Sequence, residues 1–147
     1  MRRTLAALAL VLASGPGPAQ AEDAVVRYRI VGDAVPAPLT ASVGDAERGR
    51  RIVTSRDFNC VLCHVVPDSD AQFAGNVGPS LAGVGQRLNP SQLRLRVVDQ
   101  TRINPDTVMP AYHRVEGLNR VAQRYRGKPV LAARDVEDVV AYLSTLK

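Results

Sequence analysis

The stretch FNCVLCH, residues 58–64, contains most of the cysteine and histidine residues of the chain. It holds both cysteines, Cys60 and Cys63, and one of the two histidines, His64, within a sequence of 147 residues. Cys-x-x-Cys-His is the attachment signature of c-type haem. Each thiol can form a thioether with a vinyl-derived carbon of the macrocycle, and the histidine that follows can then reach the iron. The stretch therefore predicts one covalently bound haem c, attached through Cys60 and Cys63, with His64 on the iron.

Three other interpretations of this stretch are open. A thioredoxin-like dithiol has the same cysteine spacing but belongs to a βαβ pattern, which the sequence lacks. A zinc site could add His113 to the three residues, although adjacent Cys63 and His64 do not match structural zinc spacings. A disulfide suits an oxidising compartment, yet it would close a very tight loop and leave His64 without a role. Haem attachment accounts for all three residues.

The first 21 residues have the pattern of a secretory signal peptide. Two arginines at positions 2 and 3 precede an apolar run over 5–12, and Ala-Gln-Ala at 19–21 has the small-x-small pattern of a cleavage site. The run is too short to span a bilayer, and Gly and Pro interrupt it where a core helix would continue. We expect export to the periplasm by the Sec route rather than the twin-arginine route, which suits a haem that is attached after export.

The composition of the exported chain limits its partners and its core. Removing 21 of 147 residues leaves 126 and takes the formal charge from +5 to +3, because two of the 19 Lys and Arg are lost and none of the 14 acids. This mild positive charge favours docking on an acidic protein surface over nucleic acid. Two Phe, four Tyr and no Trp are few rings for a core. We expect the haem to fill the centre, and the haem-free chain to be largely disordered or molten.

The chain divides into a signal peptide over 1–21, an extended arm over 22–43 and a domain over 44–147. The arm combines an alternating apolar stretch with prolines and is expected to lie outside the core: Val26, Tyr28, Ile30, Pro36 and Pro38. Residues 65–88 and 103–114 are rich in Gly or Pro and are expected to be loops. No second long apolar run follows residue 21.

Four helices are expected in the domain, which makes the fold class all-α. The first begins at Asp45, an N-cap with Glu47 in the first turn, and the second at Asn89-Pro90. The apolar side of the first consists of Ile52 and Val53, and that of the second of Leu93, Val97 and Val98. Two later stripes have helical spacing: Leu118, Val121, Ala122 and Tyr125, ended by Gly127 and Pro129; and Val136, Val139, Val140 and Leu143.

The second axial ligand is expected to be Met109. It is the only methionine after the initiator, and it precedes Pro110 in a proline-bracketed loop, where proline favours extended backbone. Methionine with histidine gives an electron-transfer haem of raised potential. His113 is the competitor, and ligation by two histidines would lower the potential. His113 is otherwise expected at the surface or supporting the site, since its neighbours look solvated: Tyr112, Arg114 and Glu116.

Two further features bear on the predicted site. The glycine-rich stretch 76–85 could bring a backbone carbonyl to His64, because a ligand histidine usually donates its other ring N–H to such a group; a plain turn is the alternative. Four arginines could pair with haem propionates or with an acidic partner, although a solvated helix face explains any one of them more simply: Arg87, Arg94, Arg96 and Arg102.

Five stretches together resemble the SoxX family, the small monohaem c-type cytochrome subunit of bacterial sulfur-oxidation (Sox) systems. They are GDAERGRRIVTSRDFNCVLCH, GPSLAGVGQR, NPDTVMPAYHR, YRGKPVL and VEDVVAYLSTL, and the resemblance runs from about Pro36 to Leu146. It implies the class I cytochrome c fold, in which the first and last helices cross beside the haem, here at Gly49 and Tyr142.

The resemblance also assigns roles to residues. By the family pattern Cys60 and Cys63 hold the haem, His64 is the proximal ligand, Met109 is the distal ligand, and Pro79 lies in the loop whose carbonyl accepts from His64.

The resemblance finally implies partners and a function. SoxX pairs with SoxA, a haem-bearing cytochrome, in a complex that joins thiosulfate oxidatively to a cysteine of the carrier SoxYZ and passes two electrons to a cytochrome c. The sulfur-handling cysteine of that family lies in SoxA, so we expect electron transfer and no catalytic residue here. The alternatives are a free-standing electron carrier of a respiratory chain and a haem enzyme or gas sensor with an open distal site.

Overall fold

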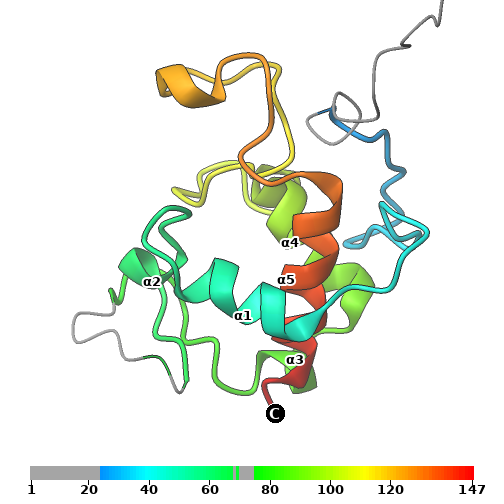
Figure 1. Cartoon of the computed structure of the whole chain (residues 1–147), viewed down its shortest axis with the longest axis vertical. Coiled ribbons are helices and arrows are strands. Elements are labelled where there is room, and N and C mark those ends of the chain that lie inside the picture. The colour runs from blue at the N-terminus through cyan, green and yellow to red at the C-terminus, as the bar shows by residue number, and fades with distance from the viewer. Residues whose placement is uncertain (1–23, 68, 70–74) are drawn as a thin grey trace, which may run out of the picture.

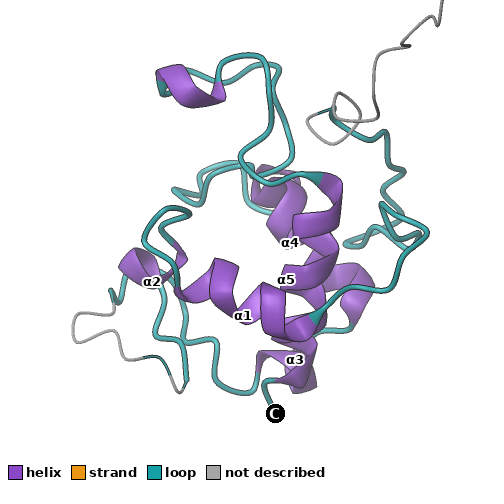
Figure 2. Ribbon diagram, viewed as in Figure 1, coloured by secondary structure: helices purple, strands orange, loops and turns teal. Residues whose placement is uncertain are grey.

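The structure is a computed structural model that describes residues 24–67, 69 and 75–147. The described residues form helices and loops without a named strand (Figures 1 and 2), and an isolated bridge joins Val31 and Ala34. The elements are α1 (Ala46–Thr54), α2 (Cys60–Cys63), α3 (Val84–Arg87), α4 (Pro90–Asp99), the 3-10 turns η2 (Gln100–Arg102) and η3 (Gln123–Tyr125), and α5 (Ala133–Thr145). The all-α prediction is confirmed. The predicted signal peptide lies outside the described residues.

Helix α1 begins where the sequence predicts. The side chain of Asp45 accepts hydrogen bonds from the backbone N–H groups of Glu47, at 2.9 Å, and Arg48, at 3.1 Å. These bonds satisfy two of the amides that a helix start leaves without a partner. Val53 is buried on the inner side of α1 and Ile52 is partly buried. The helix therefore delivers the chain to Cys60 with its apolar side on the core.

Helix α4 also begins where predicted, through a reciprocal cap. The Asn89 side chain accepts from the Gln92 N–H, and the Gln92 side chain accepts from the Asn89 N–H, both at 3.0 Å. Pro90 follows at the first helical position, where no backbone donor is needed. The predicted inward residues, Leu93, Val97 and Val98, are buried.

Helices α1 and α5 cross in close contact, as the resemblance implied (Figure 2). A side chain at Gly49 would collide with the Asp138 carbonyl and would come within 2.9 Å of the Tyr142 Cβ. Only glycine lets the two backbones approach this far. The predicted stripe of α5 is buried throughout, so its prediction is confirmed: Val136, Val139, Val140 and Leu143.

The helix predicted around Leu118 to Tyr125 is wrong. The structure has only the single turn η3 there, in a loop that projects from the body (Figure 1). Arg120 takes a left-handed conformation, with φ of 56°, within the predicted helix. A short helix is unstable in water unless its apolar side packs on something, and this segment projects away from the core that would cover it.

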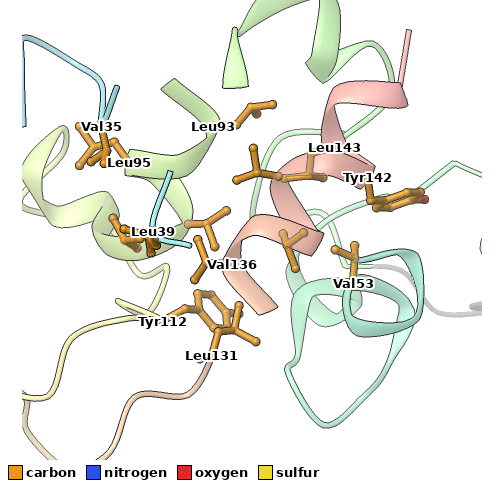
Figure 3. Packing of buried hydrophobic residues seen from close by; sticks show 14 of the residues in the cluster. Val35, Leu39, Val53, Leu93, Leu95, Tyr112, Leu131, Val136, Tyr142 and Leu143 are labelled. Atoms are coloured by element: carbon orange, nitrogen blue, oxygen red, sulfur yellow. The ribbon is translucent and has the colours of Figure 1, made fainter. Parts of the chain in front are cut away.

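The N-terminal arm is extended, but part of it belongs to the core, contrary to the prediction. Val35 is fully buried and Leu39 is nearly so, and both lie in the apolar cluster of Figure 3. The Val35 N–H donates to the Ser91 carbonyl at 2.9 Å. The alternating pattern did not reveal this packing, because the two residues lie beyond it, among the prolines.

The core consists mainly of aliphatic side chains contributed by α1, α4, α5 and the arm, with Tyr112 and Tyr142 at its edges (Figure 3). This agrees with the scarcity of rings in the sequence. Within the described residues, no helix is both long enough and apolar enough to cross a membrane.

Candidate functional site

Helix α2 places both cysteines and the adjacent histidine on one short turn. Asn59, just before it, is left-handed with φ of 64°, which turns the chain sharply after α1. The His64 N–H closes the turn by donating to the Cys60 carbonyl at 2.9 Å. Both cysteines are free thiols and partly exposed. Two thiols and an imidazole are therefore presented together at the end of one helical turn.

The loop after α2 orients the His64 ring. The His64 Nδ1 lies 2.7 Å from the Pro79 carbonyl oxygen. A carbonyl can only accept, so Nδ1 carries a proton, and Nε2 is the ring nitrogen that remains to bind a metal. This is the arrangement expected of a metal-binding histidine, and it confirms that the stretch 76–85 brings a carbonyl to His64. Among the described residues, no hydrogen bond engages Nε2.

Gly78 makes room for that ring. A side chain at this position would collide with the His64 imidazole. The Gly78 N–H donates to the Cys63 carbonyl at 2.8 Å, and the Leu81 N–H donates to the Val65 carbonyl at 2.9 Å. These backbone bonds hold the loop against the end of α2, so the position of His64 is set by the loop and not by α2 alone.

Tyr112 joins the attachment segment to the Met109 loop. Its hydroxyl donates to the Phe58 carbonyl at 2.8 Å and lies 3.9 Å from the Cys60 sulfur. Burial raises the pKa of the Tyr112 hydroxyl, and the nearby Cys60 thiol raises it further. Burial also raises the pKa of Cys60. The prediction that Tyr112 is solvated is wrong, since the residue is 5% exposed. The sequence did contain a signal for its burial at the site: Tyr112 lies three residues after Met109 in a chain that has few aromatic rings.

Met109 lies on a loop held against α4. It is partly buried against the core, and its N–H donates to the Thr107 hydroxyl at 3.1 Å. After it, the N–H groups of Tyr112 and His113 donate to the carbonyls of Val97, at 3.4 Å, and Val98, at 3.2 Å. The loop that carries the methionine is thus fixed on one side to α4 and on the other, through Tyr112, to the Cys60 segment.

His113 is not a surface residue, so the surface alternative of that expectation is wrong. It is fully buried, its Nδ1 lies 2.8 Å from the Leu131 carbonyl, and its Nε2 accepts from the Val26 N–H at 3.0 Å. Both ring nitrogens are engaged by backbone groups, so neither is available to a metal. The described residues also contain no group of three or more His, Cys, Asp or Glu side chains that could hold a metal ion. The zinc interpretation therefore has no support.

The four arginines singled out in the sequence mostly bind groups of the protein. Arg94 is buried on Glu137, with Nε 2.7 Å from Oε1 and Nη2 2.9 Å from Oε2, so a solvated helix face is wrong for it. Arg102 reaches the buried carboxylate of Asp99 at 3.2 Å. Arg87 donates to the Ala82 and Ser80 carbonyls, and Arg96 lies 3.6 Å from the Asp33 carboxylate.

The fold and this site define a class of protein, and comparison with known proteins agrees. The family model described as cytochrome c matches residues 46–147. The chain therefore belongs to the cytochrome c family. Its cofactor is one covalently bound haem c. Cys60 and Cys63 fit the attachment motif of this cofactor.

A solved structure narrows the class further. A chain of the crystal structure of SoxXA from P. pantotrophus is 39% identical, with a TM-score of 0.75, over 82% of this chain and 94% of that one. This match agrees with the resemblance to SoxX. The chain is an electron-transfer cytochrome of the SoxX type. A cytochrome c-553-like protein of Synechocystis sp. (strain ATCC 27184 / PCC 6803 / Kazusa) is 42% identical over 60 residues, which are 41% of this chain. The match spans 50% of that relative.

The described residues fit a haem on physical grounds as well. The two cysteines are not joined in a disulfide, the Pro79 carbonyl engages the His64 Nδ1 and not Nε2, and Gly78 leaves space for the ring in that orientation.

Proposed function

We propose that this chain is the SoxX subunit of a SoxXA complex, which carries electrons away from thiosulfate oxidation in the periplasm. The observation that carries the proposal is the 39% identity to a chain of a SoxXA structure over 94% of that chain. The motif Cys-x-x-Cys-His in FNCVLCH supports the haem part of the proposal independently of this identity, because the spacing of these residues alone is the signature of haem attachment.

We propose the following roles for the site residues. Cys60 and Cys63 attach the haem through thioethers, and His64 ligates the iron through Nε2 while Nδ1–H remains on the Pro79 carbonyl. Met109 is the second axial ligand. His113 is engaged by Val26 and Leu131, which favours Met109 over the competitor. When bound, the haem supplies a site that gains and loses one electron at a time.

We propose that this chain transfers electrons and takes no part in forming the sulfur–sulfur bond. Conjugation of thiosulfate to a carrier thiol forms a sulfur–sulfur bond, releases the thiol proton and frees two electrons. No free thiol is left in this chain once both cysteines are attached. The reactive cysteine would therefore lie in SoxA, SoxYZ would supply the carrier thiol, and this chain would pass the electrons singly to an acceptor cytochrome c.

The division of the chain supports a subunit rather than a free carrier. Residues 1–21 would be removed on export, and residues 44–147 would form the cytochrome c domain. The described part of the proposed arm over 22–43, residues 24–43, keeps large apolar side chains exposed, although it is packed on the domain: Val25, Ile30, Val31 and Val43. Exposed apolar side chains on an ordered segment suit a protein interface, so we propose that the arm contacts SoxA.

The test is purification of the mature protein from its native host. We expect a chain that begins near Glu22, has the added mass of one haem and co-elutes with a second haem protein. A colourless mature chain would refute the haem site. A haem-bearing monomer without a second haem protein would instead indicate the free-standing electron carrier, and would leave the site assignment standing.

A further inference from the structure

From residue 22 onward, the net positive charge of this chain is equal to the charge of one projecting segment. We call residues 115–128 the basic loop; it contains four cations, Arg120, Arg124, Arg126 and Lys128, and one acid, Glu116. Its formal charge of +3 equals that of the whole chain from residue 22 onward, whose remaining residues contain 13 cations and 13 acids. Residues 22–147 outside the basic loop thus carry no net formal charge.

The charges of the basic loop face solvent. All four cations and Glu116 are exposed, and the loop extends from the body of the molecule, with η3 at its far end (Figure 1). The Arg124 guanidinium lies 4.9 Å from the centre of the Tyr125 ring, and Arg124 remains exposed. The nearest acid in sequence, Glu116, offsets only a quarter of the positive charge. Such a concentration of one sign of charge attracts a partner of the opposite sign over distances of a Debye length.

The base of the basic loop is fixed beside the Met109 loop. The Leu131 N–H donates to the Tyr112 carbonyl at 2.9 Å, and the His113 Nδ1–H donates to the Leu131 carbonyl at 2.8 Å. Tyr112 in turn binds the Phe58 carbonyl in the attachment segment. The basic loop therefore emerges next to the proposed axial ligand, where a docked protein would lie near the haem.

The surface of the basic loop indicates a transient contact. The large exposed apolar residues of the described chain lie elsewhere, on the arm, on and after α2, and at Val77 and Val108. Long-lived interfaces have apolar centres, whereas charged surfaces mainly raise the association rate. The arm thus has the character of a lasting interface, and the basic loop that of a brief one.

We propose that the basic loop is the docking surface for the acidic face of the electron-accepting protein. This inference rests on the proposed electron-transfer function. The inference specifies where the acceptor binds and that the acceptor is negatively charged at this surface. It also explains why the association should weaken with salt.

The chain offers a matched pair of variants, because Arg-Tyr-Arg occurs twice. Arg124 and Arg126 flank Tyr125 in the basic loop, and Arg27 and Arg29 flank Tyr28 in the arm; all four arginines are exposed. The double variants R124E/R126E and R27E/R29E change the formal charge by the same amount. The visible spectrum and reduction potential of each holoprotein establish that the haem site is intact, and the pair R124Q/R126Q and R27Q/R29Q replaces the first pair if charge reversal prevents folding.

The measurement is oxidation of the reduced holoprotein by two probe proteins of opposite charge, acidic plastocyanin and basic mitochondrial cytochrome c. With plastocyanin, we expect the second-order rate constant to fall about tenfold or more between about 0.01 M and about 0.15 M salt. At low salt R124E/R126E should lower that constant about tenfold, and R27E/R29E by less than about threefold. With the basic probe, R124E/R126E should not lower the rate.

Each contrary outcome has a distinct meaning. Equal effects of the two variants would show that only net charge matters, which overturns the docking surface but not the electron-transfer function. Binding of the wild type to phosphatidylglycerol vesicles, lost in R124E/R126E while plastocyanin oxidation is unchanged, would overturn it in favour of a lipid surface. Failure of the wild type to pass electrons to either probe would refute the proposed function itself.

Discussion

Arg94 and Glu137 form a buried ion pair through two hydrogen bonds, with Nε 2.7 Å from Oε1 and Nη2 2.9 Å from Oε2. The same two side chains hold the arm: the Arg94 Nη1 donates to the Val35 carbonyl at 2.7 Å, and the Leu39 N–H donates to Glu137 Oε1 at 2.8 Å. One ion pair therefore connects α4, α5 and the arm.

Replacing Glu137 by Gln should lower the free energy of unfolding of the holoprotein by about 3 kcal/mol or more, because it leaves a buried guanidinium without its counter-charge. The arm should also become sensitive to protease between residues 24 and 39. Denaturant titration and limited proteolysis measure these two effects. The control is Glu47→Gln in the exposed Arg51–Glu47 pair, where both side chains are more than half exposed and the loss should stay below about 1 kcal/mol. Equal losses in the two variants would contradict this account.

Gly78→Ala should disturb the proximal side of the haem. The added methyl group would collide with the His64 ring, so the ring must move and its hydrogen bond to Pro79 must lengthen. We expect an altered absorption spectrum and a shifted reduction potential. Gly44→Ala is the control, since its methyl group would collide with the Glu137 carbonyl and should cost stability without changing the spectrum of the folded protein. Unchanged spectra in both variants would place the proximal ligand elsewhere.

Met109→Ala should lower the reduction potential and allow cyanide or carbon monoxide to bind rapidly at neutral pH, because loss of the thioether opens an axial position. The wild type should resist both ligands. His113→Phe is the comparison: it removes two buried hydrogen bonds and should reduce stability, while axial ligation remains. Rapid binding by the wild type would favour the open-site haem enzyme or sensor. An unchanged potential in Met109→Ala would transfer ligation to another group.

Asp45 should contribute to the acid sensitivity of the fold. Hydrogen bonds from the backbone N–H groups of Arg48 and Glu47 lower the pKa of this carboxyl below its ordinary value of 3.8. Its folded pKa is the lower one, so its contribution to stability is complete above that ordinary value and is lost as the pH falls through the folded pKa. Asp45→Asn keeps a capping oxygen but does not ionise. The stability of this variant should therefore depend less on pH than that of the wild type below about pH 5, as measured by denaturant titration across pH. Parallel curves for the two proteins would refute this role.

The parts of the fold that the sequence predicted are those stabilised by neighbours along the chain. The caps of α1 and α4 involve residues two or three positions apart, and the stripe of α5 follows from helical periodicity. The attachment motif is equally local, since five consecutive residues provide both thiols and the imidazole. Interactions over such short separations appear in sequence patterns because the backbone geometry alone brings the groups together.

The helix predicted over 118–125 shows the limit of periodicity. Its apolar spacing resembles that of α5, but α5 packs against α1 and α4, whereas the basic loop projects from the body. An apolar stripe stabilises a helix only when something covers it. Whether a cover exists depends on the path of the rest of the chain.

By itself, then, the sequence determined the haem attachment, the helix starts and the all-α class, because each depends on residues close together in the chain. The tertiary structure alone decided that His113 and Arg94 are buried and that Val35 belongs to the core. His113 binds Val26, 87 residues away, and Arg94 binds Glu137, 43 residues away. Burying a polar or charged side chain is costly unless a partner meets it, and a partner so distant in sequence is brought there only by the completed fold.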